Sequence, residues 1–331
     1  MNPVSAADSP APVPSPAPSE GVSVIIPAYN YAQYVERAVR SAVAQEHRPL
    51  EVIIVDDGST DTTPELGARL ASEFPEVRYF RQPNAGLSAA RNAGIGLASH
   101  LFVAFLDADD EWLPGMLPAA MAGFRGEPST TGLVACNSFR VDSQGAAIGE
   151  KRLPPRRDCY YTAVDILMKT RFMPSCVVAR RSCFEAAGLF DTELRSSEDR
   201  DMWLRIAASG NRIKYLAAPM VRIRKHDSNM SRHAARMVAN MRRVRRKARR
   251  AGIVARSDAG FWLRLEAIDH FQAGWMYWDE RRTGRALLHA AISLAVWPLP
   301  LDRRELHEPP FFRLRAAARF LLESAFRKGR G

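Results

Sequence analysis

The sequence has little cysteine and no long apolar run, and both absences narrow the class of protein. Its 331 residues include four cysteines, none in a C-x-x-C pair and none beside a histidine cluster. We therefore predict reduced thiols in a cytoplasmic protein, with neither a disulfide framework nor a structural zinc site. No segment reaches the roughly 20 apolar residues that a membrane-spanning helix needs. Residues 286–301 come closest, but they contain a histidine and two prolines.

The N-terminus also lacks the charged start and the apolar core of a secretory signal. Residues 9–19 alternate proline with alanine, serine and valine, which predicts an extended, disordered tail. Of the net charge of +11, residues 232–250 contribute +9, because they hold nine Lys and Arg residues and no acid. The basic character therefore belongs to one segment, and the rest of the chain is close to neutral.

Two acidic clusters each follow a short apolar segment. Residues 52–55 lead into the acidic turn 56–61, and residues 101–106 lead into the acidic turn 107–110. Apolar runs of this length that end in a turn are typical of strands buried on both faces. Ligands of an open α/β sheet bind beyond the carboxyl ends of such strands. We therefore expect one acidic crevice, which would accept a phosphate-bearing ligand only together with a divalent cation.

The order of the predicted elements favours an α/β fold. Strands are expected at 22–26, 51–55, 77–80 and 101–106, and helices between them at 34–44, 64–74 and 88–97. This alternation predicts a mostly parallel, Rossmann-like sheet with right-handed crossovers and helices on both faces. Pro27 is expected to stop the first strand. Further elements are expected as strands at 133–136, 139–141 and 221–223, as a helix at 198–208, and as helices only after residue 230.

Each acidic cluster has both a functional and a structural interpretation. Alternate carboxylates such as Asp107 and Asp109 project to one side of an extended segment and suit Mg²⁺ or Mn²⁺. The same residues equally suit a loop of helix-capping aspartates. Asp56 and Asp57 could accept from a nucleobase N–H or a ribose hydroxyl, or they could form an Asx turn.

Polar residues near other predicted elements suit the same crevice. Gly86 permits a close approach of the backbone to a ligand, and Arg91 could reach a diphosphate or pair with a nearby aspartate. Asp199 begins a helix, where an acid serves either the helix dipole or general base catalysis. His226 follows a strand and suits a metal ligand, a diphosphate contact or a position in a basic surface loop.

In combination and in this order, the motifs resemble family 2 glycosyltransferases of the GT-A fold. The resemblance is carried by Val22–Asn30, Val55–Asp61, Asn84–Asn92, Leu106–Asp110, Gly188–Asp191 and Glu198–Arg205. It extends over about residues 22–231. We expect three parts, namely a disordered tail at 1–20, a GT-A domain at 21–231 and a basic helical extension at 232–331.

The resemblance implies an inverting, metal-dependent hexosyltransferase that uses a nucleotide-diphosphate sugar with Mg²⁺ or Mn²⁺. It implies that Asp199 is the catalytic base and that Asp107 and Asp109 bind the metal, Asp109 more directly. The nucleotide-sugar site that it implies comprises Pro27, Ala28, Tyr29, Asp56, Asp57, Asn84, Gly86, Arg91, Asp107, Glu198 and His226. The Q-x-x-R-W motif of processive members is absent, which argues against a polymerising synthase.

The basic segment 232–250 is expected to form a helix with Met237, Met241, Val244 and Ala248 on one stripe. Such a helix could pack on the main domain or contact anionic lipid headgroups. We expect no nucleic-acid partner, because the stripe of arginines lacks an aromatic residue for base stacking. Acceptors of such transferases include lipid-linked and cell-envelope glycans, so attachment to the inner membrane face stays open. A helical hairpin is expected at 261–298.

Two other classes stay open. A sugar-phosphate nucleotidyltransferase would carry a Gly-rich loop with basic residues after the first strand, where this chain has Pro27–Asn30. A non-catalytic scaffold with a basic membrane-binding tail would tolerate loss of the acids, yet every acid expected of the family is present.

Overall fold

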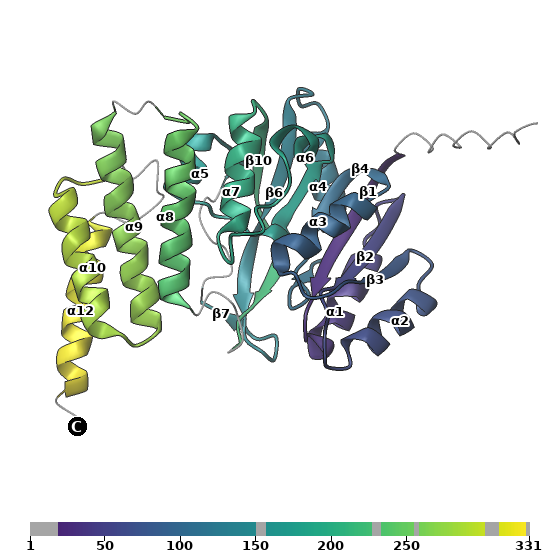
Figure 1. Cartoon of the computed structure of the whole chain (residues 1–331), viewed down its shortest axis with the longest axis horizontal. Coiled ribbons are helices and arrows are strands. Elements are labelled where there is room, and N and C mark those ends of the chain that lie inside the picture. The colour runs from purple at the N-terminus through teal and green to yellow at the C-terminus, as the bar shows by residue number, and fades with distance from the viewer. Residues whose placement is uncertain (1–18, 150–156, 227–232, 255–257, 302–310, 329–331) are drawn as a thin grey trace, which may run out of the picture.

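The computed structural model describes residues 19–149, 157–226, 233–254, 258–301 and 311–328 (Figure 1). Its strands are β1 (Ser19–Ala28), β2 (Leu50–Asp56), β3 (Val77–Arg81), β4 (His100–Phe105), β5 (Glu111–Trp112), β6 (Thr131–Val141), β7 (Ala147–Ile148), β8 (Cys159–Tyr161), β9 (Val177–Arg180) and β10 (Arg212–Arg224). They form one mixed sheet in the order β3-β2-β1-β4-β9-β6-β10-β5, with β7 paired to β6 and β8 to β10. The tail predicted at 1–20 lies almost wholly outside the described residues.

Helices cover both faces of this sheet and continue beyond it. The helices of the sheet region are α1 (Ala32–Val43), α2 (Thr63–Glu73), α3 (Leu87–Leu97), α4 (Met116–Phe124), α5 (Ala163–Met168), the 3₁₀ turn η1 (Pro174–Cys176), α6 (Ser182–Ala187) and α7 (Glu198–Ala208). The helices after residue 233 are α8 (Ala234–Arg250), α9 (Ala259–Asp279), α10 (Thr283–Val296) and α12 (Phe312–Lys328). The predicted α/β class, with helices on both faces and a helical extension, is confirmed.

The N-terminal half of the sheet is parallel, as predicted. β1 pairs in parallel with β2 and with β4, and β2 pairs in parallel with β3. The expectation that Pro27 stops the first strand is wrong, because Pro27 pairs with Val55 and β1 continues to Ala28. The β1–β4 ladder ends at Ile25 and Phe105. The missing N–H of Pro27 therefore costs no hydrogen bond to β4.

The C-terminal half of the sheet differs more from the sequence-based expectation. The two strands predicted at 133–136 and 139–141 are one strand, β6, which pairs in parallel with β10 along its length. Buried Asn137 and Ser138 interrupt the apolar pattern at the point where the β6–β10 register shifts. The short strand β9 was not predicted. It runs antiparallel to both β4 and β6.

Strand direction determines which loops meet. Because β9 is antiparallel to its two neighbours, β10 runs in the same direction as β1, β2 and β4. The loops that follow these four strands, and the η1 turn that precedes β9, therefore lie at one edge of the sheet. This edge is where ligands of an open α/β sheet bind.

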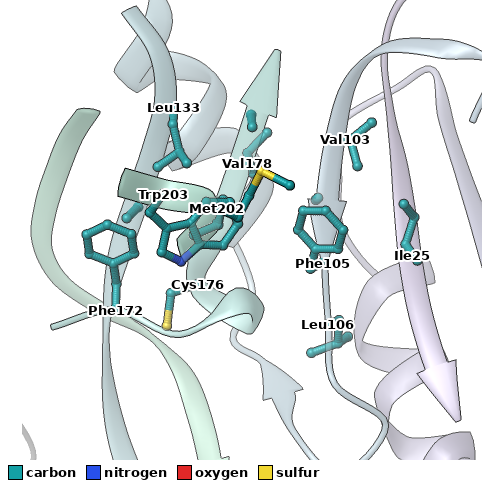
Figure 2. Packing of buried hydrophobic residues seen from close by; sticks show 14 of the residues in the cluster. Ile25, Val103, Phe105, Leu106, Leu133, Phe172, Cys176, Val178, Met202 and Trp203 are labelled. Atoms are coloured by element: carbon teal, nitrogen blue, oxygen red, sulfur yellow. The ribbon is translucent and has the colours of Figure 1, made fainter. Parts of the chain in front are cut away.

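Helix α7 is anchored by a buried aromatic cluster (Figure 2). Trp203 is fully buried, and its ring lies 6.2 Å from Phe105 of β4 and 6.3 Å from Phe172 between ring centres. Burying a side chain of this size contributes roughly 2–3 kcal/mol before costs are counted. This packing fixes the N-terminus of α7, which carries Glu198 and Asp199, at the ligand edge of the sheet.

The C-terminal helices pack in succession beyond α7 (Figure 1). Val244 of α8 and Leu265 of α9 belong to the same apolar core as the sheet, whereas α9, α10 and α12 enclose a second cluster around Phe320. The hairpin expected at 261–298 is confirmed as α9 and α10. Among the described residues, no helix combines the length and the apolar character needed to cross a bilayer.

Candidate active site

The first acidic cluster lies at the end of β2, and its two carboxylates, Asp56 and Asp57, accept hydrogen bonds from other parts of the protein. Asp56 is completely buried, and its carboxylate accepts from the Ser59 N–H at 2.8 Å and from the Tyr79 hydroxyl at 2.6 Å. Asp57 accepts from the Gln82 side chain at 2.7 Å and from two backbone N–H groups of the loop before α3. These carboxylates therefore hold loops together. Their contact with a nucleobase or ribose stays a prediction.

The loops after β1 and β2 are tied to each other. Asn30 has a left-handed backbone with φ 57°, and its side-chain oxygen accepts from the backbone N–H groups of Thr60 and Asp61. Asp61 in turn accepts from the Ala32 N–H at the start of α1. Of the predicted pocket residues in these loops, Pro27 and Ala28 are buried and Tyr29 is 45% exposed. Asn84, in the loop before α3, is exposed as well.

Arg91 joins two sequence-distant acids. Its Nη2 donates to Asp107 at 2.6 Å and its Nη1 donates to Glu198 at 2.8 Å, while the side chain is only 1% exposed. Of the two alternatives considered for Arg91, the structure shows the pairing with a nearby aspartate. A direct contact of Arg91 with a diphosphate stays a prediction. Burial and the neighbouring Asp109 charge raise the pKa of Asp107 despite the Arg91 partner.

His226 contacts Asp109 of the second acidic cluster. Its Nε2 lies 2.9 Å from Oδ2 of Asp109, and its ring stacks on Tyr34 with 5.1 Å between ring centres. The ring of Tyr31 meets the same imidazole edge-on at 5.8 Å. This contact follows from the parallel directions of β4 and β10, because Asp109 follows the former and His226 follows the latter.

A buried support below this cluster was missed from the sequence. Ser175 in η1 donates to Asp110 at 2.5 Å and accepts from the Asp107 N–H. The Arg224 backbone N–H also donates to Asp110, and its Nε donates to the Asp109 carbonyl at 3.1 Å. Burial first, and then the charges of Asp109 and Asp107, raise the pKa of Asp110 well above its usual value. No sequence pattern pointed to Ser175. It reaches the site because β9 runs antiparallel to its neighbours, so that the turn before β9 lies at the ligand edge of the sheet.

The four charged residues that begin α7 have four different partners. Glu198 pairs with Arg91, and Arg200 donates to the carbonyls at the end of α5, including Ile166. Asp201 pairs with Lys247 of α8 at 2.7 Å. Asp199 accepts only from the Arg200 backbone N–H at 2.7 Å, and no described Lys or Arg lies within ion-pair distance of it. Burial and the Glu198 charge raise the pKa of Asp199 to about 7.

The basic helix α8 holds the segment that leads into α7. Lys247 pairs with Asp191 at 2.9 Å, Arg243 pairs with Glu193, and Asn240 donates to Ser196 at 2.9 Å. Of the predicted stripe, Met241, Val244 and Ala248 are buried, whereas Met237 is half-buried and Val238 is buried in its place. Some of the positive charges of residues 232–250 therefore form ion pairs within the protein. The apolar side of this helix packs on the main domain, which was one of the two alternatives expected for it.

The oxygen ligands of the second cluster suit a hard divalent cation. Asp107 and Asp109 offer carboxylate oxygens, and their side chains are 28% and 13% exposed. Across the part of the chain that the structure describes, no group of three or more His, Cys, Asp or Glu side chains could hold a metal ion. Mg²⁺ commonly keeps one or two protein carboxylates and completes its shell with water and substrate phosphates. The pair therefore fits a cation that arrives with a phosphate-bearing ligand.

The fold and the site define a GT-A type domain, and comparisons with known proteins agree. Residues 23–181 match the model of Glycosyl transferase family 2. This segment, 159 of the 331 residues, is therefore similar to glycosyl transferase family 2. The matched segment contains both acidic clusters and Arg91, whereas Asp199 and His226 lie beyond it.

Curated relatives align over parts of their length only. An uncharacterized glycosyltransferase of Nostoc is 44% identical over 105 residues, 31% of this chain and 33% of the relative. The uncharacterized glycosyltransferase EpsJ of Bacillus subtilis is 28% identical, and the match spans 63% of this chain and 62% of EpsJ. Chondroitin synthase of Pasteurella multocida is 37% identical over 38% of this chain and 13% of the synthase. The chain thus spans less than two thirds of each of these relatives.

Solved structures share the fold over most of the chain. The mannosyltransferase PcManGT of Pyrobaculum calidifontis, in complex with GDP-Man and Mn²⁺, superposes with a TM-score of 0.60 at 21% identity, over 94% of this chain and 81% of PcManGT. S. aureus TarS 1-349 in complex with UDP-GlcNAc superposes with a TM-score of 0.55 at 19% identity, over 93% of this chain and 92% of TarS. At this level of identity the likeness establishes the fold alone.

Proposed function

We propose that this protein is an inverting glycosyltransferase that moves a sugar, a hexose in the simplest case, from a nucleotide-diphosphate sugar to an acceptor hydroxyl. One observation carries the proposal. Among the three acids that begin α7, Asp199 alone lacks a cationic partner in the described part of the chain, and its pKa of about 7 suits a general base at neutral pH. The family match of residues 23–181 and the nucleotide-sugar complexes of PcManGT and TarS support the same activity.

The reaction needs one displacement. Asp199 takes the proton of the acceptor hydroxyl while that oxygen forms a bond to the anomeric carbon. The bond from this carbon to the diphosphate oxygen breaks on the opposite face, and the nucleoside diphosphate leaves with the bonding electron pair. The product has an inverted anomeric centre, and no protein nucleophile takes part.

The other residues of the crevice hold the reacting groups in place and offset charge. Arg91 holds Glu198, beside the base, and Asp107 in fixed places. Asp107 and Asp109 would hold Mg²⁺ or Mn²⁺, and such a cation would offset the charge that grows on the leaving group. His226 orients Asp109 through the 2.9 Å contact. The complex of PcManGT with Mn²⁺ supports the metal without deciding between the two ions.

The first test is binding of the leaving group. Melting temperatures are measured with UDP, GDP, CDP and dTDP, each with Mn²⁺ and with EDTA, since a ligand that binds the native state raises the melting temperature. Stabilisation by one diphosphate, larger with metal, is expected and names the donor class. If none of the four shifts the wild type, the crevice does not bind nucleotides and the scaffold hypothesis takes its place.

The released product separates the transferase from the nucleotidyltransferase. A glycosyltransferase releases a nucleoside diphosphate when supplied with donor and acceptor, whereas a nucleotidyltransferase releases pyrophosphate from a nucleoside triphosphate and a sugar phosphate. We expect release of the nucleoside diphosphate and no pyrophosphate. Release of pyrophosphate would overturn the assignment.

We also propose that the acceptor is a cell-envelope glycan or a lipid-linked glycan and that residues 232–250 contact an anionic membrane surface. Within α8, Arg236, Arg242 and Arg246 are exposed. Helices α10 and α12, which pack beyond α9, expose large apolar side chains, namely Leu288, Leu314, Leu321 and Leu322. Helices that lie at a bilayer interface typically carry exposed basic and exposed apolar side chains. The likeness to a chondroitin synthase supports a role in polysaccharide synthesis.

Vesicle flotation tests the membrane proposal. We expect binding to vesicles with phosphatidylserine, release at high salt, and weaker binding after Arg236, Arg242 and Arg246 are changed to Ser. Equal binding to neutral phosphatidylcholine vesicles would contradict an electrostatic attachment.

A further inference from the structure

The glycine before α3 lies against an arginine that the sequence analysis did not single out. Gly86 is the N-terminal cap of α3, with φ +95°, and a β-carbon built on it would lie only 2.4 Å from Nη1 of Arg195. The close approach that a glycine was expected to permit here is thus made by a guanidinium. Arg195 belongs to the segment that leads into α7, three residues before Glu198.

This position of Arg195 is fixed from both sides. On its N-terminal side Glu193 pairs with Arg243 of α8, and on its C-terminal side Ser196 accepts from Asn240 of α8. Glu198 then pairs with Arg91, one and a half turns along α3 from Gly86. The segment 195–198 and the first turns of α3 therefore run side by side, with Arg195 over the start of the helix.

Two other arginines beside the described acids already have partners. Arg91 lies between Asp107 and Glu198, and Arg224 donates to the carbonyls of Asp109 and two residues of the 142–143 turn. Arg195 is exposed, and the structure gives it no hydrogen bond or ion pair with any described residue. It is therefore a cation available to a ligand beside an acidic crevice.

We infer that Arg195 is a phosphate-binding residue that contacts the diphosphate of the bound donor and, later, of the leaving nucleoside diphosphate. The inference rests on the proposed function and assigns a role that the family motifs leave to Arg91. A guanidinium donates in a planar fork that matches phosphate oxygens. Its charge opposes the repulsion of the anionic ligand by Asp107, Asp109, Glu198 and Asp199.

The test compares affinities of Arg195 variants for graded ligands. Dissociation constants are measured by calorimetry for the nucleoside, its monophosphate and its diphosphate, using whichever of UDP, GDP, CDP or dTDP stabilises the wild type. Each is measured with Mn²⁺ and with EDTA. The variants are Arg195→Ala and Arg195→Lys, and the control is Arg125→Ala, another exposed arginine, at the C-terminal end of α4.

We expect Arg195→Ala to weaken diphosphate binding about tenfold, in line with one charge-assisted hydrogen bond. Binding of the nucleoside should stay unchanged, the loss should persist in EDTA, and Arg195→Lys should lose less because it keeps the charge. Arg125→Ala should match the wild type. Melting temperatures without ligand should agree within about 1 °C, since exposed side chains contribute little to stability.

Several outcomes would overturn the inference while leaving the transferase assignment intact. One is diphosphate affinity of Arg195→Ala within twofold of the wild type, and another is an equal loss for the nucleoside. A third is unchanged diphosphate affinity with a raised KM for the acceptor, which would move Arg195 to the acceptor side. Failure of the wild type to bind any diphosphate would overturn the proposed function itself.

Discussion

The two acidic clusters look alike in the sequence and differ in the folded protein. Asp56 and Asp57 follow β2, and every oxygen of both carboxylates accepts a hydrogen bond from the protein. Asp107 and Asp109 follow β4, where Asp107 pairs with Arg91 and Asp109 contacts His226, and their side chains are 28% and 13% exposed. The first cluster connects loops of the protein, whereas the second is partly open to solvent. An acidic turn after a buried strand therefore indicates where a site lies without deciding which acids serve it.

The largest effect is expected at Asp199, which has no cationic partner among the described residues. Asp199→Asn keeps the shape of the side chain and removes the base, so kcat should fall by roughly 10²- to 10⁴-fold. Initial rates of sugar transfer measure this change. The affinity for the nucleoside diphosphate should remain, and its loss together with the rate would assign Asp199 to binding instead.

The next effect concerns the arginine that joins the second cluster to α7. Arg91→Met should destabilise the protein by about 3 kcal/mol, because it leaves the buried Glu198 and the partly buried Asp107 without their cationic partner. Chemical denaturation measures the change. The matched control is Arg69→Met, which removes two exposed ion pairs with Glu36 and Glu73 and should cost no more than about 1 kcal/mol. Similar losses for both variants would contradict the role given to Arg91.

A third change separates the two clusters directly. Asp56→Ala should lower the free energy of unfolding by roughly 2 kcal/mol, because the Ser59 N–H and the Tyr79 hydroxyl lose their acceptor. Asp109→Ala removes the contact of a partly exposed side chain with His226 and should alter the melting temperature far less, while it weakens Mn²⁺-dependent diphosphate binding. Thermal melts with and without Mn²⁺ test both variants. The comparison fails if Asp109→Ala proves the less stable of the two.

The smallest effect is a dependence on pH. Because the pKa of Asp199 is raised to about 7, kcat/KM should fall about tenfold per pH unit below this value as the base becomes protonated. The raised pKa also means that the folded state binds more protons than the unfolded state between pH 4 and 7. Its contribution to stability is therefore lost as the pH rises through this window.

Denaturation of the wild type and of Asp199→Asn at several pH values checks the sign. Relative to the Asn variant, the wild type should become less stable as the pH rises from 4 to 7. A wild type that gains stability over this range would show that the Asp199 carboxylate is better accommodated when charged.

The N-terminal half of the fold could be predicted because each element there is local in sequence. The predicted strands and helices between residues 22 and 106 all occur, since alternating apolar runs and turn residues specify parallel β–α units. Beyond them, prediction failed where the chain reverses direction. Four residues of β9 give too short a pattern, and buried Asn137 and Ser138 concealed the continuity of β6.

Motifs and periodicity along the chain were sufficient to predict the resemblance to family 2 glycosyltransferases, the class of fold and the positions of the acids. The pairing of the charges became visible in the folded protein. Arg91 is bound between Asp107 and Glu198, Lys247 of the basic helix is bound to Asp201, and Arg195 lies over Gly86. These partners are brought together by strand direction and helix packing, and spacing in the sequence carries no information about either.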